Sequence, residues 1–152
     1  MIDLTVGFTL VREFPATPAE MWRYWTDPAE ATHWMHPRGV TTPQETIRFD
    51  VRPGGRYEYV MVNAETGERY PTGGVFREVV PYERMVFTWG KPDDDPDDCP
   101  LVTVTFQPTA AGTQMTFDLR GVPGRPSDDI YEGWEEALDR LGEHVSSGKD
   151  HR

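Results

Sequence analysis

SDDIYEGWEEALDRLGEHV, residues 127–145, is the only long stretch of this sequence with a strong helical pattern. Its apolar residues lie three or four positions apart, which places them on one face of an α-helix. They are Ile130, Trp134, Leu138, Leu141 and Val145, with Tyr131 beside them. A helix with one apolar face must pack against another element, because that face would otherwise stay in water. We therefore expect the preceding chain to supply the surface that this helix covers.

From residue 45 onward the sequence pattern changes to a period of two. Alternating apolar and polar residues are typical of strands with one buried face. The pattern predicts strands over residues 46–51, 57–61, 74–80, 85–89, 102–107 and 113–119, after a first strand over 8–14. These strands predict an α+β domain in which an antiparallel sheet is covered by the C-terminal helix.

Two short helices are predicted between the first strand and this series. Thr17-Pro18-Ala19-Glu20 has the residues of a capping box, with proline at the first helical position. Asp27-Pro28-Ala29-Glu30 repeats the start signal, and the second helix is expected to end near Trp34.

Composition limits the class of protein. A chain of 152 residues is most simply one domain, spanning 1–152, with residues 146–152 expected to fray. The net charge of −11 disfavours nucleic acid and anionic membranes as partners. Cys99 is the only cysteine and no charged-then-apolar leader starts the chain, so we expect a cytoplasmic protein.

Residues 90–100, GKPDDDPDDCP, contain five aspartates and three prolines. Such a segment has too little apolar surface to pack, and proline cannot donate to a strand ladder. We expect a solvated loop that is dispensable for folding, so its replacement should leave the melting temperature unchanged or raise it.

Several short stretches, in this order, resemble a known family. They are PAEMW (18–22), WTDP (25–28), Trp34, RPGG (52–55), GVF (74–76), EVVP (78–81), RMVFTW (84–89), VTVTF (102–106), and Gly133-Trp134 with Leu138 and Leu141. Together they are similar to the START-like (SRPBCC) superfamily, in the branch related to the C-terminal domain of the activator of the ninety-kilodalton heat-shock protein's ATPase. The resemblance implies a helix-grip fold, in which a curved antiparallel sheet of about six to seven strands wraps around the long C-terminal helix.

The resemblance also implies a space between sheet and helix, which in this superfamily commonly holds an apolar small molecule. The residues expected to face that space are Trp25, Trp34, Tyr57, Tyr59, Met61, Phe76, Phe87, Trp89, Val104, Phe106, Met115, Phe117, Tyr131, Trp134 and Leu138, with Met21 and Met35 closing one end. Any single apolar position is more often core than binding site. Methionines make adaptable pocket walls, however, and the polar atoms of buried Tyr and Trp need partners.

No metal site or cofactor is predicted. His33 and His36 have no third ligand at zinc-site spacing, and residues 93–98 lack the glycine and terminal glutamate of a calcium loop. Acidic neighbours should raise the pKa of Cys99, which makes it a poor nucleophile.

Three functions fit these observations. A binding module for an apolar or aromatic small molecule is favoured. A polyketide cyclase or aromatase-like enzyme is less favoured, because it needs Tyr57, Tyr59, His36 or Tyr131 to act inside the pocket. The third is a chaperone-associated interaction domain, with a chaperone or a second copy as partner. The family's namesake has a separate N-terminal domain, whereas this chain starts almost directly on its first strand, which weakens the third hypothesis. An interior filled by its own side chains would favour the interaction domain. An open space with apolar walls would favour the binding module.

Overall fold

The computed structural model describes residues 2–123 and 128–150, which begin on the strand β1 (Gly7–Phe14). Two short helices follow, α1 (Pro18–Thr26) and α2 (Pro28–Ala31). The capping box of α1 is confirmed: the Thr17 and Glu20 side chains each accept a hydrogen bond from the other residue's backbone N–H. Asp27 caps α2 by accepting from the Ala29 N–H at 2.9 Å. The local sequence signals therefore start both helices where they were predicted.

The described part of the chain contains eight strands, which form one antiparallel sheet. After β1 they are β2 (Val40–Thr41), β3 (Arg48–Phe49), β4 (Arg56–Asn63), β5 (Arg69–Val80), β6 (Arg84–Thr88), β7 (Leu101–Thr109) and β8 (Gly112–Arg120), with single 3₁₀ turns at Gln44–Thr46 (η1) and Pro96–Asp98 (η2). Their order is β1-β8-β7-β6-β5-β4-β2, and β3 also pairs with β4. The first strand thus pairs with the last one. The prediction of about six to seven strands missed β2 as a separate strand, because two residues are too few to show a period.

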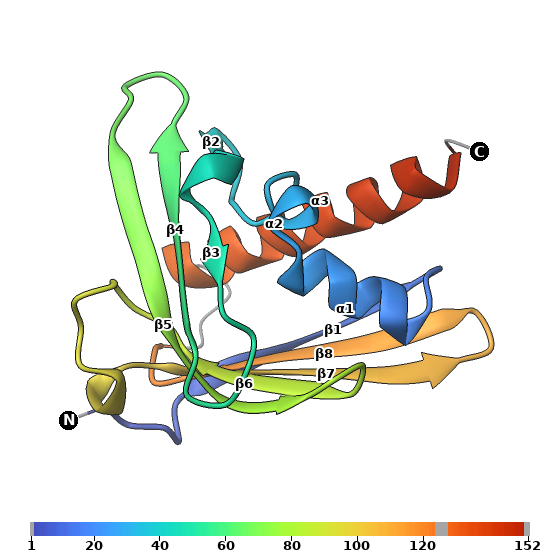
Figure 1. The fold of residues 1–152 in the computed structure, drawn as a ribbon, viewed down its shortest axis with the longest axis horizontal. Coiled ribbons are helices and arrows are strands. Elements are labelled where there is room, and N and C mark those ends of the chain that lie inside the picture. The colour runs from blue at the N-terminus through green and yellow to red at the C-terminus, as the bar shows by residue number, and fades with distance from the viewer. Residues whose placement is uncertain (1, 124–127, 151–152) are drawn as a thin grey trace.

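The long strand β5 joins the two parts of the sheet and bends between them. Its first part, up to Val75, pairs with β4, whereas Phe76–Val80 pairs with β6, with a shift of register between Phe76 and Glu78. Gly74 lies at this bend, where an added Cβ would be 2.1 Å from the Thr88 carbonyl oxygen. Figure 1 shows the result: the β4–β5 hairpin rises steeply away from β7 and β8.

The C-terminal helix α3 (Asp129–Asp150) lies across the concave side of the sheet (Figure 1). It continues to Asp150; the expected start at Ser127 and the last two residues of the tail expected to fray, 151–152, lie outside the described residues. Arg12 of β1 binds Asp139 of α3 at 2.6 Å, which fixes the helix over that edge of the sheet. The α+β helix-grip fold is confirmed.

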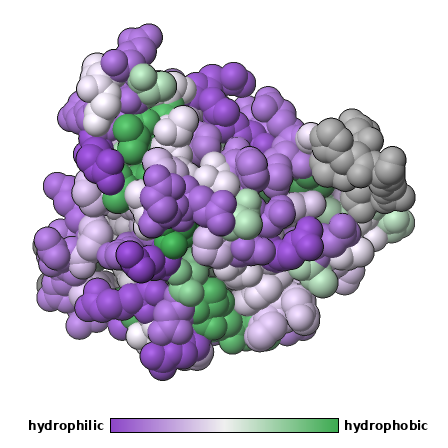
Figure 2. Space-filling view, turned by 45° about the horizontal axis from the view of Figure 1, so that its top comes forward, coloured by the Kyte–Doolittle hydropathy of each residue, from purple (hydrophilic) through white to green (hydrophobic). Residues whose placement is uncertain are grey.

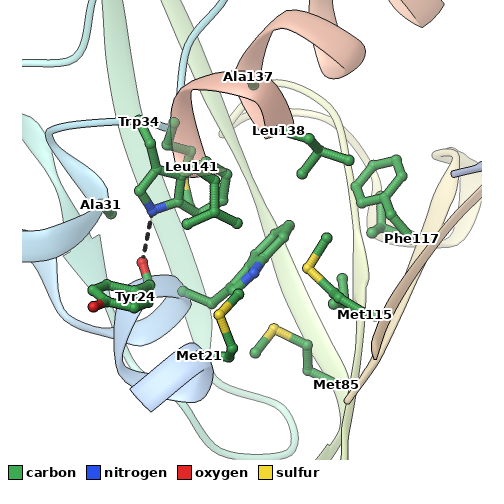
Figure 3. Close-up of a cluster of buried hydrophobic side chains, with 14 of the residues drawn as sticks. Met21, Tyr24, Ala31, Trp34, Met85, Met115, Phe117, Ala137, Leu138 and Leu141 are labelled. Carbon is green, nitrogen blue, oxygen red and sulfur yellow. Dashed lines mark hydrogen bonds between the residues drawn. The ribbon is translucent and has the colours of Figure 1, made fainter. Parts of the chain in front are cut away.

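The main core lies between α3, α1 and the sheet. Figure 3 shows Leu138 and Leu141 of α3 directed into the space among Met21, Met115 and Phe117, and all five are fully or almost fully buried. The Nε1–H of Trp34 donates to the Tyr24 carbonyl oxygen at 2.9 Å and ties the segment after α2 to α1. This half of the interior is filled by its own side chains.

Candidate functional site

A cavity of about 450 Å³ lies at the N-terminal half of α3, where the β4–β5 hairpin bends away. Its walls are Met35, His36, Pro37, Val40, Tyr59, Met61, Tyr70, Trp89, Asp129, Ile130, Gly133, Trp134 and Ala137. They come from the segment after α2, from β4 and β5, from the residue after β6 and from α3. The volume falls in the range of small-molecule sites.

The helix α3 contributes one continuous face to this cavity. Ile130 and Trp134 are four positions apart, as are Gly133 and Ala137, and the two pairs lie side by side on that face. Gly133 leaves the wall open, because an added Cβ would meet only Pro37, at 3.9 Å. The space thus depends on a residue without a side chain near the N-terminal end of α3.

His36 places a hydrogen-bond acceptor on the cavity wall. Its side chain is 6% exposed, and its Nδ1 lies 3.1 Å from the Thr42 hydroxyl oxygen. That hydroxyl donates to the Met35 carbonyl oxygen at 2.9 Å, so Nδ1 carries the proton and donates to it, which leaves Nε2 as an acceptor. Burial, and then the positive charge of Arg140, lowers the pKa of His36 to about 4. The imidazole is therefore neutral at pH 7.

Tyr59 and Trp89 form a second polar position on the wall. Tyr59 is 4% exposed, and burial raises the pKa of its hydroxyl well above 10. Trp89 and Thr72 lie near the phenol oxygen and oppose part of this rise in pKa, although the Thr72 hydroxyl itself donates to the Tyr70 carbonyl oxygen at 3.5 Å. Among the described residues, however, the Trp89 Nε1–H makes no hydrogen bond of ordinary geometry. The Tyr59 hydroxyl likewise makes no hydrogen bond to a described residue, so its proton can be donated to another group.

The outer rim of the cavity is formed by partly exposed residues. Tyr70 is 37% exposed, and its hydroxyl donates to the Glu68 carboxylate at 3.0 Å. Asp129, at the start of α3, is also exposed. Figure 2 shows this side of the molecule as mostly hydrophilic, with small apolar areas on and beneath the β4–β5 hairpin at the upper left.

A much smaller space of about 20 Å³ adjoins the cavity. It is lined by Trp25, Met35, Phe49, Tyr57, Tyr59, Phe76, Met85, Phe87 and Trp134, of which Met35, Tyr59 and Trp134 also line the cavity. Tyr57 is not available there, since its hydroxyl donates to the Thr88 carbonyl oxygen at 2.6 Å. This space is large enough for about one water molecule.

The residues proposed from the sequence divide into three groups. Tyr59, Met61, Trp89 and Trp134 line the cavity. Trp25, Tyr57, Phe76 and Phe87 surround the small space beside it. Trp34, Val104, Phe106, Met115, Phe117, Tyr131 and Leu138 line neither and pack in or against the core, as Tyr131 does against Phe8 at a ring distance of 4.8 Å.

Several cavity residues were not proposed as lining from the sequence. They are His36, Pro37, Val40, Tyr70, Asp129, Ile130, Gly133 and Ala137. Gly133 carried a usable signal, because a glycine inside an apolar helix face is unfavourable unless space or close packing requires it. The positions in the segment after α2 carried none, since no period relates that segment to the sheet.

Other chemistry-bearing residues lie apart from the cavity. His33 stacks on His144 at a ring distance of 4.8 Å, and His144 contacts Glu30 at 2.9 Å. Within the described part of the chain, no three His, Cys, Asp or Glu side chains gather as metal ligands. Burial, then Asp94 and its neighbours, raises the pKa of the Cys99 thiol, in the direction expected from the sequence.

Residues 2–123 and 128–150 include no helix that is both long and apolar enough to cross a membrane.

A curved antiparallel sheet that wraps one long helix and leaves an apolar-walled cavity between them defines a helix-grip protein. Comparison with known families identifies the family within this fold class. The sequence profile described as "Activator of Hsp90 ATPase homolog 1-like protein" matches residues 15–146, and the chain belongs to this family.

Solved structures agree with that assignment. A Nitrosomonas europaea protein is 26% identical with a TM-score of 0.80, covering 99% of this chain and 100% of its own. A Chromobacterium violaceum protein is 27% identical with a TM-score of 0.79, and the match covers 91% of this chain and 96% of that protein. A family member from Silicibacter pomeroyi is 28% identical with a TM-score of 0.75, and the match covers 93% of this chain and 98% of that protein. No protein of curated function matches this chain.

Proposed function

We propose that this protein is a binding module for an apolar or aromatic small molecule, which it holds between the β4–β5 hairpin and the first half of α3. The observation that carries the proposal is a cavity of about 450 Å³ with mainly apolar and aromatic walls. Cavities of this size and composition are typical of small-molecule sites. Met35 and Met61 allow the walls to adapt to different shapes.

The residues of the cavity support binding more strongly than catalysis. A general base works best with a pKa near the working pH, whereas the pKa of His36 is about 4. Its Nδ1 contacts the hydroxyl of Thr42 rather than a carboxylate that could stabilise an imidazolium. A cyclase-like activity would therefore depend on Tyr59, because the Tyr57 hydroxyl is bound to the Thr88 carbonyl and Tyr131 lies outside the cavity lining.

A chaperone-associated role has less support from the surface. The large apolar residues on and after the two short helices, Trp22, Trp34 and Met35, are only 9%, 0% and 7% exposed and offer no docking surface. A partner would have to recognise another surface.

The test is a thermal-shift and tryptophan-fluorescence screen with flavonoids, sterols, fatty acids and aromatic polyketides. A bound molecule should change the emission, because Trp89 and Trp134 line the cavity. It should also stabilise the protein, by about 2.7 kcal/mol when its concentration is a hundred times Kd.

Two glycines of α3 supply matched variants for this test. Gly133→Leu places a side chain in the cavity and should lower the affinity at least about tenfold, whereas the helix loses an unfavourable glycine. Gly142→Ala also removes a helix glycine, but its Cβ faces Phe14 at 3.7 Å, so affinity should stay unchanged. If no compound stabilises the parent protein, or if both variants bind equally well, the proposed site is wrong.

A further inference from the structure

Among residues 2–123 and 128–150, those that line the cavity include hydrogen-bonding groups but no cation. The lining residues include neither lysine nor arginine, and the one charged group among them is the carboxylate of Asp129 at the rim. His36 is uncharged at neutral pH. A carboxylate that entered would lose its hydration without gaining a charged partner in the walls, which is costly.

Arg140 is a cation whose positive charge acts on His36, although it does not line the cavity. Its buried Nε has no hydrogen-bond partner among the described residues. A variant of Arg140 is therefore needed to exclude a role for its charge in binding.

Two polar atoms on the walls remain available to a ligand. The Nε2 of His36 accepts, because Nδ1 donates to Thr42, and no described residue donates to Nε2. The Tyr59 hydroxyl can donate, because it makes no hydrogen bond to another described residue. A hydroxyl group on a ligand matches this pair, since it can donate to one atom and accept from the other.

The other walls favour a flat molecule. Trp89, Trp134, Tyr59 and Tyr70 present aromatic side chains to the same cavity, and Trp89 meets Trp134 at a ring distance of 5.9 Å. Aromatic rings pack well in offset or edge-to-face contacts with such residues.

We infer that the cavity selects uncharged, flat molecules that carry a hydroxyl group, of which phenols are the simplest class, and disfavours carboxylates of the same shape. The ligand hydroxyl donates to Nε2 of His36 and accepts from the Tyr59 hydroxyl. This inference rests on the proposed binding function and adds the chemical class of the ligand.

The experiment compares naphthalene, 2-naphthol and 2-naphthoate at pH 7 by fluorescence titration. Naphthol should bind roughly tenfold more tightly than naphthalene, the effect of about one well-formed hydrogen bond, and naphthoate more weakly than both. Naphthalene binding with no preference for naphthol would overturn this inference and leave the binding function intact. Failure of all three to bind would remove both.

Substitutions at His36 and Tyr59 test which wall atoms bind the ligand hydroxyl. His36→Asn keeps a donor near Thr42 but removes the acceptor at Nε2, whereas His36→Gln keeps one near that position. His36→Asn and Tyr59→Phe should each weaken naphthol up to roughly tenfold and leave naphthalene unchanged, which also shows that the cavity is intact. His36→Gln should restore part of the loss. Tyr131→Phe is the matched control, because Tyr131 lies outside the cavity lining.

Two results would contradict the assignment of these atoms. Equal loss of naphthol and naphthalene in Tyr59→Phe would indicate damage to the cavity rather than a missing hydrogen bond. Tight naphthoate binding that is lost in Arg140→Gln would identify a site for anions instead.

Discussion

At the scale of single residues, His36 shows how burial changes the chemistry of a side chain. The residue comes directly after the buried Met35 and is held by Thr42, so the fold takes its ring out of bulk water. The charges of Arg140 on α3 and of His33, three positions before His36, lower the pKa of His36 further because they repel a second positive charge. A histidine that looks like a surface residue in the sequence becomes a neutral acceptor in the folded protein.

This burial predicts a contribution to acid sensitivity. The unfolded chain protonates His36 near pH 6.5, whereas the folded protein does so only near pH 4. Unfolding therefore takes up a proton between these values, and His36 makes stability fall as the pH decreases from 6.5 to 4. His36→Asn lacks this contribution, so it should lose less stability than the parent over that range, by roughly 2 kcal/mol.

Urea unfolding of both proteins at pH 7, 5 and 4 measures the difference. Other titratable groups are common to both proteins, so their contributions to the difference cancel. Parallel pH profiles would mean that His36 is protonated equally easily in the folded and the unfolded protein.

At the scale of elements, the acidic segment 90–100 is more ordered than its composition indicated, although most of it is exposed. The Asp94 carboxylate accepts from the Lys91 N–H at 2.9 Å, and Asp95 caps η2. Gly90 bridges to Gly73, and the Pro100 carbonyl accepts from the Trp89 N–H, so the loop ends are joined to the sheet. The ends are thus structural, whereas the centre makes only local and surface contacts.

Replacement of residues 93–98 by a Gly/Ser linker, with Gly90 and Pro100 kept, should change the free energy of unfolding by less than about 1 kcal/mol. The Arg77–Asp97 ion pair lost in this change is exposed and contributes little. Relief of repulsion among the aspartates acts in the opposite direction. Thermal melts with and without calcium measure both effects. A large decrease in stability, or stabilisation of the parent by calcium, would show that the segment has a structural or metal-binding role.

At the scale of the whole molecule, Trp134 connects the filled and the open parts of the interior. Its ring lies 4.5 Å from that of Phe117 on β8 and 5.9 Å from that of Trp89 beside the cavity. It is 7% exposed. One side chain thus packs α3 against the core and at the same time forms a wall of the proposed site.

Trp134→Ala should cost about 3–5 kcal/mol of stability, because it removes a large buried aromatic group and enlarges an existing space. Denaturant unfolding measures the loss, with Glu132→Ala on the exposed side of the same helix as the control. A loss below about 1 kcal/mol, as at a surface site, would mean that α3 does not depend on this contact.

The sequence by itself determined the elements and their order. The signals for them are local: Thr17 and Glu20 define the start of α1, alternation marks the strands from β4 to β8, and the spacing from Ile130 to Val145 defines α3. Residues close in the chain carry these signals, so no knowledge of distant contacts was needed.

Only the tertiary structure decided where the interior is filled and where it is open. Met115 and Tyr59 have the same inward pattern in the sequence, but Met115 packs under α3, whereas Tyr59 faces the cavity. The difference arises because β5 bends near Gly74 and carries β4 away from the helix, and because Gly133 supplies no side chain to close the gap. A void depends on whether side chains from distant segments meet, and no local period in the sequence encodes that distance.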